Sequence, residues 1–241
     1  MRTPTKRAGK SRPKRARQAL SQDRILQTAM RLADKTGVEA LSMRKLARAL
    51  GVEAMSLYKH VADKDAVLDG LVDLVVREIG MPLAATDWRT AMRHHAISTR
   101  QVCLRHRWAA VLMELRGAQS PIRLRYADAI LGLLRTAGFT VPTAYRAFLL
   151  IDSYLYGFIM QEANWPSDEG EMAQVATFVT SQSPQAGYPA LVEAMSYVMS
   201  ANPQSSGFYD AEFEHGLEMI LDGLERVRRD AVGSEPAAQG T

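Results

Sequence analysis

The stretch from Leu41 to Val61, LSMRKLARALGVEAMSLYKHV, limits the possible folds of this chain more than any other. Ser42 precedes a run of apolar residues at helical spacing, and its hydroxyl can accept an N–H group of the first helical turn. Gly51 ends this run, because glycine adopts the positive φ of a sharp turn without steric cost. Leu57 and Val61 then share one face of a second short helix. The pattern predicts a helix-turn-helix whose second helix can lie in a DNA major groove.

The outward side chains of this motif suit contacts with DNA. Arg44, at the start of the first helix, can donate two hydrogen bonds to guanine O6 and N7. Met55 can pack on a thymine methyl group, and Ser56 and Tyr58 can reach bases or phosphates, with packing inside the motif as the alternative for Tyr58. The other polar members position the duplex through its phosphates. The predicted DNA-binding residues are Ser42, Arg44, Met55, Ser56, Tyr58, Lys59, His60 and Lys64.

The charge of the chain is unevenly divided between its two ends. Residues 1–70 contain 16 Lys and Arg against 7 Asp and Glu, and residues 71–241 contain 14 against 19, within a net charge of +4. A positive end that also carries a helix-turn-helix indicates a nucleic-acid partner. Residues 1–20 are basic and contain no acid, so we expect a disordered arm that binds phosphates or enters a minor groove. A tail that serves only solubility is the alternative.

The sequence lacks the patterns of several other protein classes. No apolar run of about 18 residues predicts a transmembrane helix, so we expect no membrane partner and a cytoplasmic location. Cys103 is the only cysteine, which excludes a disulfide framework and a cysteine zinc site. No GxSxG, HExxH or phosphate-binding glycine loop occurs. His94 and His95 would point about 100° apart on a helix and cannot share a metal. We therefore expect no enzyme, no metal and no cofactor.

The rest of the chain is predicted to be helical. Apolar residues at helical spacing predict helices over 21–35, from Asp63 onward, and over 88–105, 107–116, 121–137, 188–200 and 210–229. A long helix is also predicted from Thr140 or Thr143 to about Asn164. No alternation typical of strands occurs, so the expected fold class is all-α. We expect a disordered basic arm over 1–20, a helix-turn-helix domain over 21–66, a helical body over 67–230 and a flexible tail over 231–241.

Residues 21–75 resemble the DNA-binding domain of the TetR family of bacterial transcriptional regulators. The matching positions are Ala29, Leu32, Gly37, Leu41–Ala47, Leu50–Val52, Ser56–Val61, Asp63–Asp65 and Leu68. The SLYKHV run followed by Lys64 is most similar to the tetracycline-repressor branch. The resemblance implies a three-helix N-terminal domain that binds DNA, with Arg44 in contact, and a larger helical domain for ligand binding and dimerisation. Ala54 and Met55 stand where the family often has Gln or Pro, so the operator sequence cannot be transferred.

The same resemblance implies how the chain would act. It would be a repressor that binds a palindromic operator in double-stranded DNA as a homodimer and is released by a small-molecule effector. Helices 143–164 and 210–229 would form the contact between protomers, and Gly157 would permit close approach. The alternative is a helix-turn-helix dimer that has no small-molecule effector.

The family also implies an effector cavity among the body helices. The residues expected to line it are His95, Thr99, Met113, Ile130, Tyr145 and Phe148, which suit a mostly apolar molecule. Tyr145, Phe148, Asp152 and Tyr156 recur at helical spacing, a pattern that fits core packing and cavity lining alike. Met113 lies where tetracycline repressors hold a drug-bound magnesium with a histidine. A tetracycline–magnesium ligand is therefore not expected.

Overall fold

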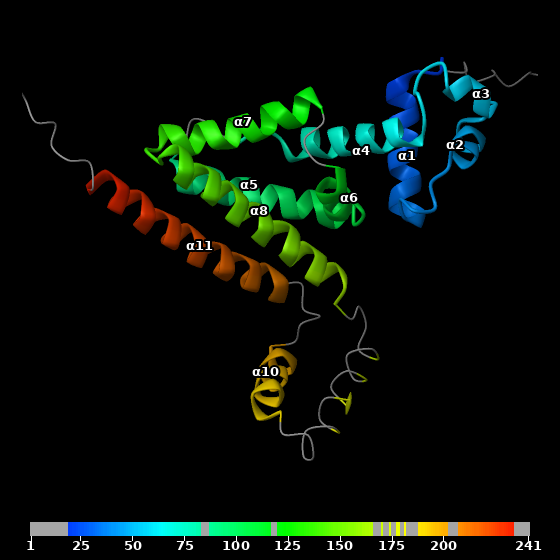
Figure 1. The fold of residues 1–241 in the computed structure, drawn as a ribbon. Coiled ribbons are helices and arrows are strands. Elements are labelled where there is room, and N and C mark those ends of the chain that lie inside the picture. Colours follow the sequence, from blue (N-terminus) through cyan, green and yellow to red (C-terminus); the bar gives the residue numbers. More distant parts are fainter. Residues whose placement is uncertain are drawn as a thin grey trace, which may run out of the picture.

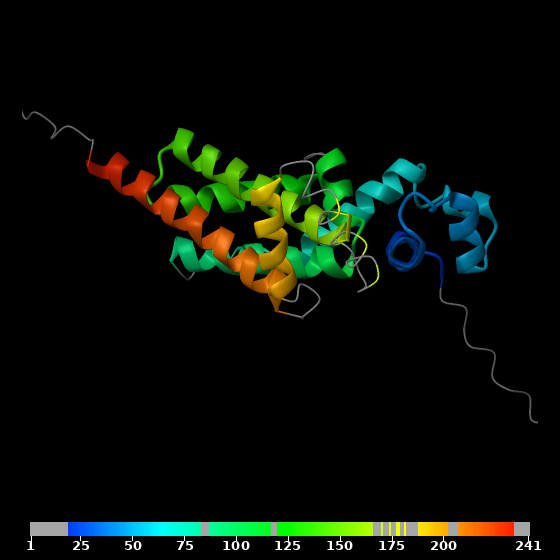
Figure 2. The ribbon, with the colours of Figure 1, turned by 90° about the horizontal axis from the view of Figure 1, so that it is seen from below.

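The computed structural model describes residues 19–82, 87–116, 120–165, 188–201 and 207–233, together with residues 170, 174, 177, 178 and 181. Within these residues the elements are helices and no strand occurs, which confirms the all-α class. A small N-terminal domain and a larger body are joined by α4 (Lys64–Ile79), as Figures 1 and 2 show. No helix in this part of the chain is long and apolar enough to cross a membrane. Most of the expected arm and tail lies outside the described residues.

The N-terminal domain has the predicted helix-turn-helix. Its helices are α1 (Gln22–Thr36), α2 (Met43–Leu50) and α3 (Ala54–Leu57). The Ser42 hydroxyl caps α2 by accepting the Lys45 N–H at 3.3 Å. Gly51 adopts the left-handed conformation, with φ 68° and ψ 36°, between α2 and α3. Side chains from every helix meet in the core, among them Ile25, Ala29, Leu46, Leu57 and Val61.

The second helix of the motif is shorter than the sequence pattern suggests. α3 ends at Leu57, and turns continue over residues 58–60. Glu53 precedes α3 without a side-chain cap, and its carbonyl accepts the Ser56 N–H at 2.9 Å, which satisfies one N–H group of the first turn. The Val61 N–H donates to the Leu57 carbonyl at 3.0 Å, which keeps both apolar side chains turned inward. The outer face of this segment remains available for a partner.

The body contains α5 (Trp88–Arg105), α6 (Ala109–Arg116), α7 (Pro121–Thr136), α8 (Val141–Ala163), α10 (Pro189–Ser200) and α11 (Phe208–Gly233). α8 packs against α5, α6, α7 and α11, and so forms the centre of the body. α10 stands apart below α8 and α11 in Figure 1, and none of its side chains is buried. α11 continues to Gly233, into the segment that we expected to be a tail.

α4 belongs to both domains, because it crosses the expected boundary between residues 66 and 67. Asp63 caps it by accepting the Ala66 N–H at 2.8 Å. On one side it packs so closely on α1 that a Cβ added to Gly70 would lie 2.8 Å from Leu26 Cδ1. Its other contacts are with α5, α6 and α7 of the body. A displacement of α4 would therefore move the helix-turn-helix with it.

Arg100 joins three helices of the body. Its Nε and Nη2 atoms donate to the two carboxylate oxygens of Glu162 at 2.8 and 2.7 Å. Its Nη1 atom donates to Asp210 Oδ1 at 2.6 Å, and the guanidinium lies 5.1 Å from the centre of the Phe213 ring. A buried charge is tolerated when it is paired and hydrogen-bonded. This cluster thus fixes α5 to α8 and α11.

Candidate functional site

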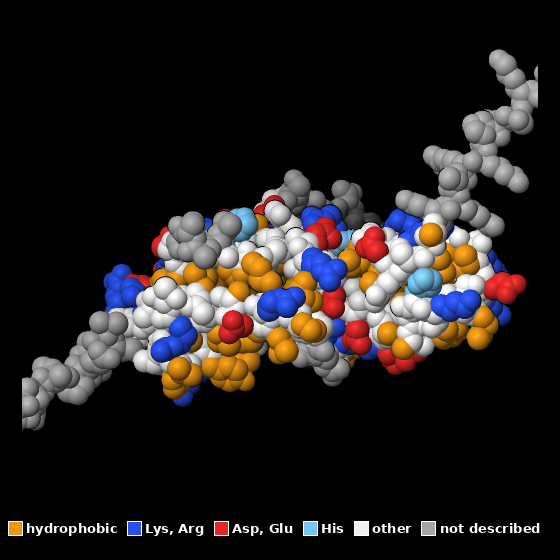
Figure 3. Space-filling model, turned by 90° about the horizontal axis from the view of Figure 1, so that it is seen from above, with side chains coloured by type: hydrophobic (Ala, Val, Ile, Leu, Met, Phe, Trp, Pro, Cys, Tyr) orange, Lys and Arg blue, Asp and Glu red, His pale blue; other side chains and the backbone are white. Residues whose placement is uncertain are grey.

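The outward face of the helix-turn-helix is open to solvent. The Met55 side chain is 72% exposed and Tyr58 is 46% exposed, so Tyr58 points outward rather than into the motif. Arg44, Lys59 and His60 are also exposed, and Arg44 has no ion-pair partner among the described residues. Figure 3 shows Lys, Arg and His side chains at this end of the molecule. Exposed cations suit phosphate contacts, and the exposed Met55 side chain beside them suits a contact with a base.

The other predicted DNA-binding residues are less exposed. Ser42, Ser56 and Lys64 are half-buried, and the Ser42 oxygen is already used as a helix cap. The Ser42 hydroxyl proton stays available for a phosphate oxygen. Lys45 and Arg48 lie exposed on α2 and were not in the predicted set. Because they lie on the same short helix as Arg44, the sequence could have identified them as possible DNA contacts.

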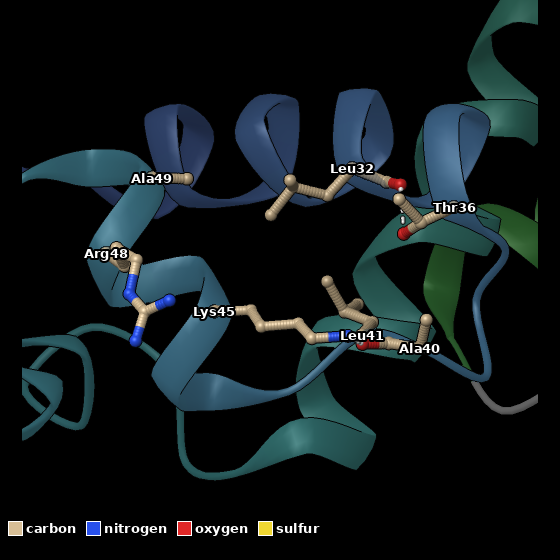
Figure 4. A pocket seen from close by; sticks show the side chains of 7 residues that line it. All are labelled: Leu32, Thr36, Ala40, Leu41, Lys45, Arg48 and Ala49. Carbon is tan, nitrogen blue, oxygen red and sulfur yellow. Dashed lines mark hydrogen bonds between the residues drawn. The ribbon is translucent and has the colours of Figure 1, made fainter.

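A hollow of about 280 Å³ lies between α1 and α2, as Figure 4 shows. It is lined by Leu32, Thr36, Ala40, Leu41, Lys45, Arg48 and Ala49. The Lys45 side chain extends along it, and its Nζ atom donates to the Ala40 carbonyl at 2.8 Å. Among the described residues, no body helix contributes to the lining. We therefore assign this hollow to packing within the N-terminal domain.

A second cavity, of about 290 Å³, lies in the body and reaches the linking helix. Its walls come from α4 (Val72, Val76), α6 (Met113, Glu114), α7 (Arg123, Tyr126, Ala127) and α8 (Phe148, Asp152, Tyr156). Sites for small ligands are mostly apolar cavities with a few polar groups, with volumes from about 300 Å³ upward. This cavity has that composition and lies at the lower end of that range. An occupant would touch the helix that carries the DNA-binding domain.

The residues predicted to line an effector cavity lie in three different environments. Met113 and Phe148 are on the cavity wall. Tyr145 is 55% exposed on α8 and does not line it. The remaining members are buried and lie outside the lining: His95, Thr99 and Ile130. The cavity thus brings together only two of the six.

Several wall residues were not indicated by the sequence. They are Val72, Val76, Glu114, Arg123, Tyr126 and Ala127. The sequence could not assign Val72 and Val76 of α4 to the wall, because an apolar residue that faces a cavity has the same periodicity as one that faces the core. Asp152 was different, because an acid in an otherwise apolar part of a long helix indicates a special environment.

Burial keeps several groups around this cavity uncharged. Desolvation, with a smaller effect of His94, lowers the pKa of His95 to about 4, and the His95 Nε2 atom lies 3.1 Å from the Tyr126 hydroxyl. Desolvation also raises the pKa of the Cys103 thiol to about 12. The phenol pKa values of Tyr126 and Tyr156 are raised for the same reason. At neutral pH these groups therefore contribute no charge.

The carboxylates of α4 bind arginines of the body. Arg116, at the end of α6, donates to Asp65 Oδ1 at 2.6 Å, and its Nε atom lies 3.2 Å from Asp69. Arg123 of α7 donates through Nε to Asp73 Oδ1 at 3.2 Å and lies 3.4 Å from Asp69. Arg123 is also part of the cavity wall. The ion pairs thus connect the cavity to α4.

A further contact joins α1 directly to the body. The His106 Nδ1 atom lies 2.8 Å from Asp34 Oδ1 of α1, and its Nε2 atom lies 3.0 Å from Glu78 Oε2 of α4. Trp108 Nε1 also donates to Asp34, at 2.7 Å. Partial burial raises the pKa of Glu78, but hydrogen bonds from Arg105 and His106 outweigh it and leave the pKa below its ordinary value. The junction of α5 and α6 thus binds α1 of the N-terminal domain and the linking helix α4.

The helix-turn-helix presents exposed cations, and it is attached to α4, which also lines a cavity in the helical body. This combination defines a two-domain DNA-binding regulator. Among the described residues, no group of His, Cys, Asp and Glu could hold a metal ion. Residues 25–71 match the bacterial regulatory proteins of the tetR family, and residues 81–228 match the tetracyclin repressor-like C-terminal domain. The chain belongs to the TetR family and is a DNA-binding transcriptional regulator of the ligand-responsive repressor type.

Individual relatives agree with this assignment along most of the chain. The class A tetracycline repressor of Escherichia coli is 33% identical, over 87% of this chain and 92% of its own length. The HTH-type transcriptional repressor DrrR1 of Streptomyces coeruleorubidus is 32% identical, over 89% of this chain and 81% of its own. The crystal structure of the Streptomyces coelicolor TetR family protein ActR in complex with actinorhodin has a TM-score of 0.71 at 28% identity, covering 87% of this chain and 99% of ActR.

Proposed function

We propose that two copies of this chain bind a palindromic operator and repress transcription, and that a small molecule in the body cavity releases them. The observation that carries the proposal is that α4 both supports the helix-turn-helix and lines the cavity through Val72 and Val76. DrrR1 and the class A relative are named as repressors, and ActR holds actinorhodin in its structure. The protein would act in the cytoplasm on chromosomal or plasmid DNA and would catalyse no reaction.

The DNA contacts follow from the exposed face of the motif. Arg44 would bind a guanine, and Met55 and Tyr58 would contact base edges from α3 and the turn after it. Ser42, Ser56, Lys59, His60 and Lys64, with Lys45 and Arg48, would hold the phosphates. One such short helix gives little specificity. Two of them, about 34–36 Å apart in a dimer, would read a palindrome.

The surfaces for dimerisation would be α8 and α11. α8 exposes Leu149, which is 44% exposed, and a Cβ added to Gly157 would meet nothing within 4 Å. α11 exposes Met219 at 63% and Val227 at 45%. Large apolar side chains aligned on neighbouring helices suit burial against a second copy. α10, whose apolar side chains also lie exposed, would be covered in the same assembly.

Release requires that the ligand bind the DNA-incompetent state more tightly than the competent one. An occupant of the cavity would press on Val72 and Val76 of α4 and on Arg123 of α7. Because Arg123 is paired with Asp69 and Asp73, its displacement would also pull on α4. The resulting shift of α4 would change the distance between the two recognition helices.

The DNA-binding part of the proposal is tested with operator DNA selected from a random pool by the purified protein. Arg44→Ala should raise the dissociation constant about 5- to 150-fold, which corresponds to the roughly 1–3 kcal/mol of a bidentate guanine contact. Arg77→Ala is the control, since it removes the same charge from an exposed position on α4 away from the motif. Fluorescence anisotropy gives both constants. Equal affinities of the two variants would contradict the assigned interface.

The effector part is tested with the protein's own promoter in a reporter strain. Ala127→Trp places a large ring into the cavity from α7. Repression should persist, because the DNA-binding face is unchanged, but a compound that relieves repression by the wild type should lose its effect. An Ala127→Trp variant that responds as the wild type does would show that the effector binds elsewhere.

A further inference from the structure

We propose that the body cavity recognises a cation, namely a protonated or quaternary amine carried on an aromatic framework, through the carboxylates of Asp152 and Glu114. The inference rests on the proposed function, because it takes this cavity as the effector site and specifies the chemical class of the effector. It adds a positive charge to the mostly apolar ligand that the sequence predicts. The molecule should be apolar over most of its surface and carry one positive charge.

Asp152 is the residue that the packing of the body does not explain. It lies half-buried on α8, in the cavity wall, between the apolar residues Ile151 and Leu155. Among the described residues it has no hydrogen-bond or ion-pair partner. A desolvated carboxylate without a partner destabilises the folded protein, whereas a ligand with a positive charge would supply that partner. Glu114 of α6 is exposed, and it adds to the same lining a second carboxylate that has no partner among the described residues.

Arg123, the one cation among the described wall residues, does not balance these two carboxylates. The Arg123 guanidinium lies 3.2 Å from Asp73 Oδ1 and 3.4 Å from Asp69 Oδ1, both on α4. Its charge is therefore already satisfied by two acids outside the cavity lining. With Asp152 and Glu114 ionised, the cavity has an excess of negative charge, which favours a cationic ligand and opposes an anionic one.

The other titratable groups around Asp152 are uncharged at neutral pH. Tyr126 of α7 and Tyr156 of α8 are phenols with raised pKa values, and His95 and Cys103 of α5 lie behind Tyr126 as neutral groups. Burial, with a contribution from Glu114, raises the pKa of Asp152 itself to about 7. A bound cation would favour the ionised form of Asp152. Binding should therefore strengthen as the pH rises through 7.

The rest of the wall defines the framework of the ligand. Tyr126, Phe148 and Tyr156 provide aromatic rings, and Met113 provides a thioether that adapts its shape to a ring. The faces of aromatic rings also attract cations. With a volume of about 290 Å³, the cavity suits a fused tricyclic molecule rather than a large antibiotic.

The test compares two probes of nearly the same shape, 10-methylacridinium and acridine, by fluorescence titration of the full-length protein at pH 8. The first is permanently cationic, and the second is neutral at this pH. We expect 10-methylacridinium to bind at least about tenfold more tightly. Because its charge does not change with pH, its affinity should fall about tenfold from pH 8 to pH 6 as Asp152 takes up a proton. Equal affinities, or no binding of the cation, would overturn the proposal.

Variants test whether the preference for the cationic probe depends on the Asp152 carboxylate. Asp152→Asn should abolish both the preference for the cation and its pH dependence, and Glu114→Gln should reduce the preference less. Asp128→Asn is the matched control, since it removes the same charge from an exposed position on α7 outside the cavity. Thermal unfolding confirms that each variant is folded. A preference that survives in Asp152→Asn would overturn the assignment.

Operator release is measured separately and distinguishes the two proposals. A cation preference that depends on Asp152, without any release of operator DNA, would contradict the effector role of the cavity and support the cation site. Release by neutral compounds alone, blocked by Ala127→Trp, would support the effector role and overturn the cation site.

Discussion

The DNA-binding face and the body cavity are built from the chain in different ways. The face comes from one continuous stretch, Leu41 to Lys64, and its side chains are mostly exposed and free of protein partners. The cavity comes from four helices that extend from Val72 to Tyr156. Arg123 and Tyr126 on its wall are buried, and Asp152 is half-buried. Residues of the face can therefore change without unfolding the protein. Residues around the cavity contribute to stability and to function together.

The largest expected effect is in the small core under the DNA-binding face. Leu46→Ala should cost roughly 2–5 kcal/mol, because Leu46 is fully buried and the three short helices cannot fill the space. The N-terminal domain should then open while the body stays folded. Hydrogen exchange would show fast exchange confined to α1–α3, together with loss of operator binding.

Leu155→Ala in the centre of α8 is the control for Leu46→Ala, because Leu155 is equally buried, at 1% exposed, but lies in the body. It should lower the unfolding temperature of the body and leave exchange in α1–α3 nearly unchanged. If Leu46→Ala increases exchange throughout the body as well, the two regions unfold as one unit and are not separate domains.

The next largest effect concerns the ion pairs that join the body helices. Glu162→Gln would leave the Arg100 guanidinium with Asp210 as its remaining carboxylate partner in this cluster. Breaking a buried pair by removing one partner costs about 3 kcal/mol, because the other charge stays desolvated. Thermal unfolding should show the loss, and operator affinity of the folded protein should be unchanged. Glu193→Gln, exposed on α10, should have no measurable effect.

The contrast also explains what could be predicted from the sequence. The helix-turn-helix was predictable because its caps, its turn glycine and its apolar spacing lie within one short stretch, around Ser42 and Gly51. The body helices followed from apolar periodicity. The cavity was not predictable to the same extent, since Val72 and Tyr126 meet only after four helices have packed. Likewise, nothing in the sequence pairs Asp34 with His106, which are far apart in the chain.

A smaller effect is expected from Asp152, and its sign depends on pH. The pKa of Asp152 is raised from an ordinary value of 3.8 to about 7, so the folded state binds more protons than the unfolded state between these values. Stability due to this group therefore falls as the pH rises from about 4 to about 7. Asp152→Asn removes this penalty and should stabilise the protein by on the order of 1–3 kcal/mol at pH 8.

Unfolding in urea at a series of pH values measures this effect. The gain in Asp152→Asn should be largely lost near pH 4, where the wild-type carboxyl is protonated in the folded state and about half protonated in the unfolded state. A gain of the same size at pH 4 and pH 8 would mean that packing or hydrogen bonding, rather than the charge, sets the difference.

The smallest expected effect concerns the contact that joins the two regions. His106 faces Asp34 of α1 through Nδ1 and Glu78 of α4 through Nε2. His106→Asn keeps an amide near the Nδ1 position and so retains the hydrogen bond to Asp34. His106→Gln keeps an amide near the Nε2 position and retains the hydrogen bond to Glu78. Loss of the hydrogen bond to Asp34 weakens the attachment of α1 to the body, so the N-terminal domains of a dimer would adopt more orientations before they bind two half-sites.

His106→Gln should therefore weaken operator binding about two- to fivefold, or about 0.4–1 kcal/mol, and His106→Asn should weaken it less. The Trp108 hydrogen bond to Asp34 remains in both variants and keeps the effect small. Anisotropy titrations with the selected operator, at equal folded concentration, provide the comparison. A greater loss in His106→Asn would show that the position of the N-terminal domain is set through α4 and Glu78, and that the direct contact of α1 with the body contributes little.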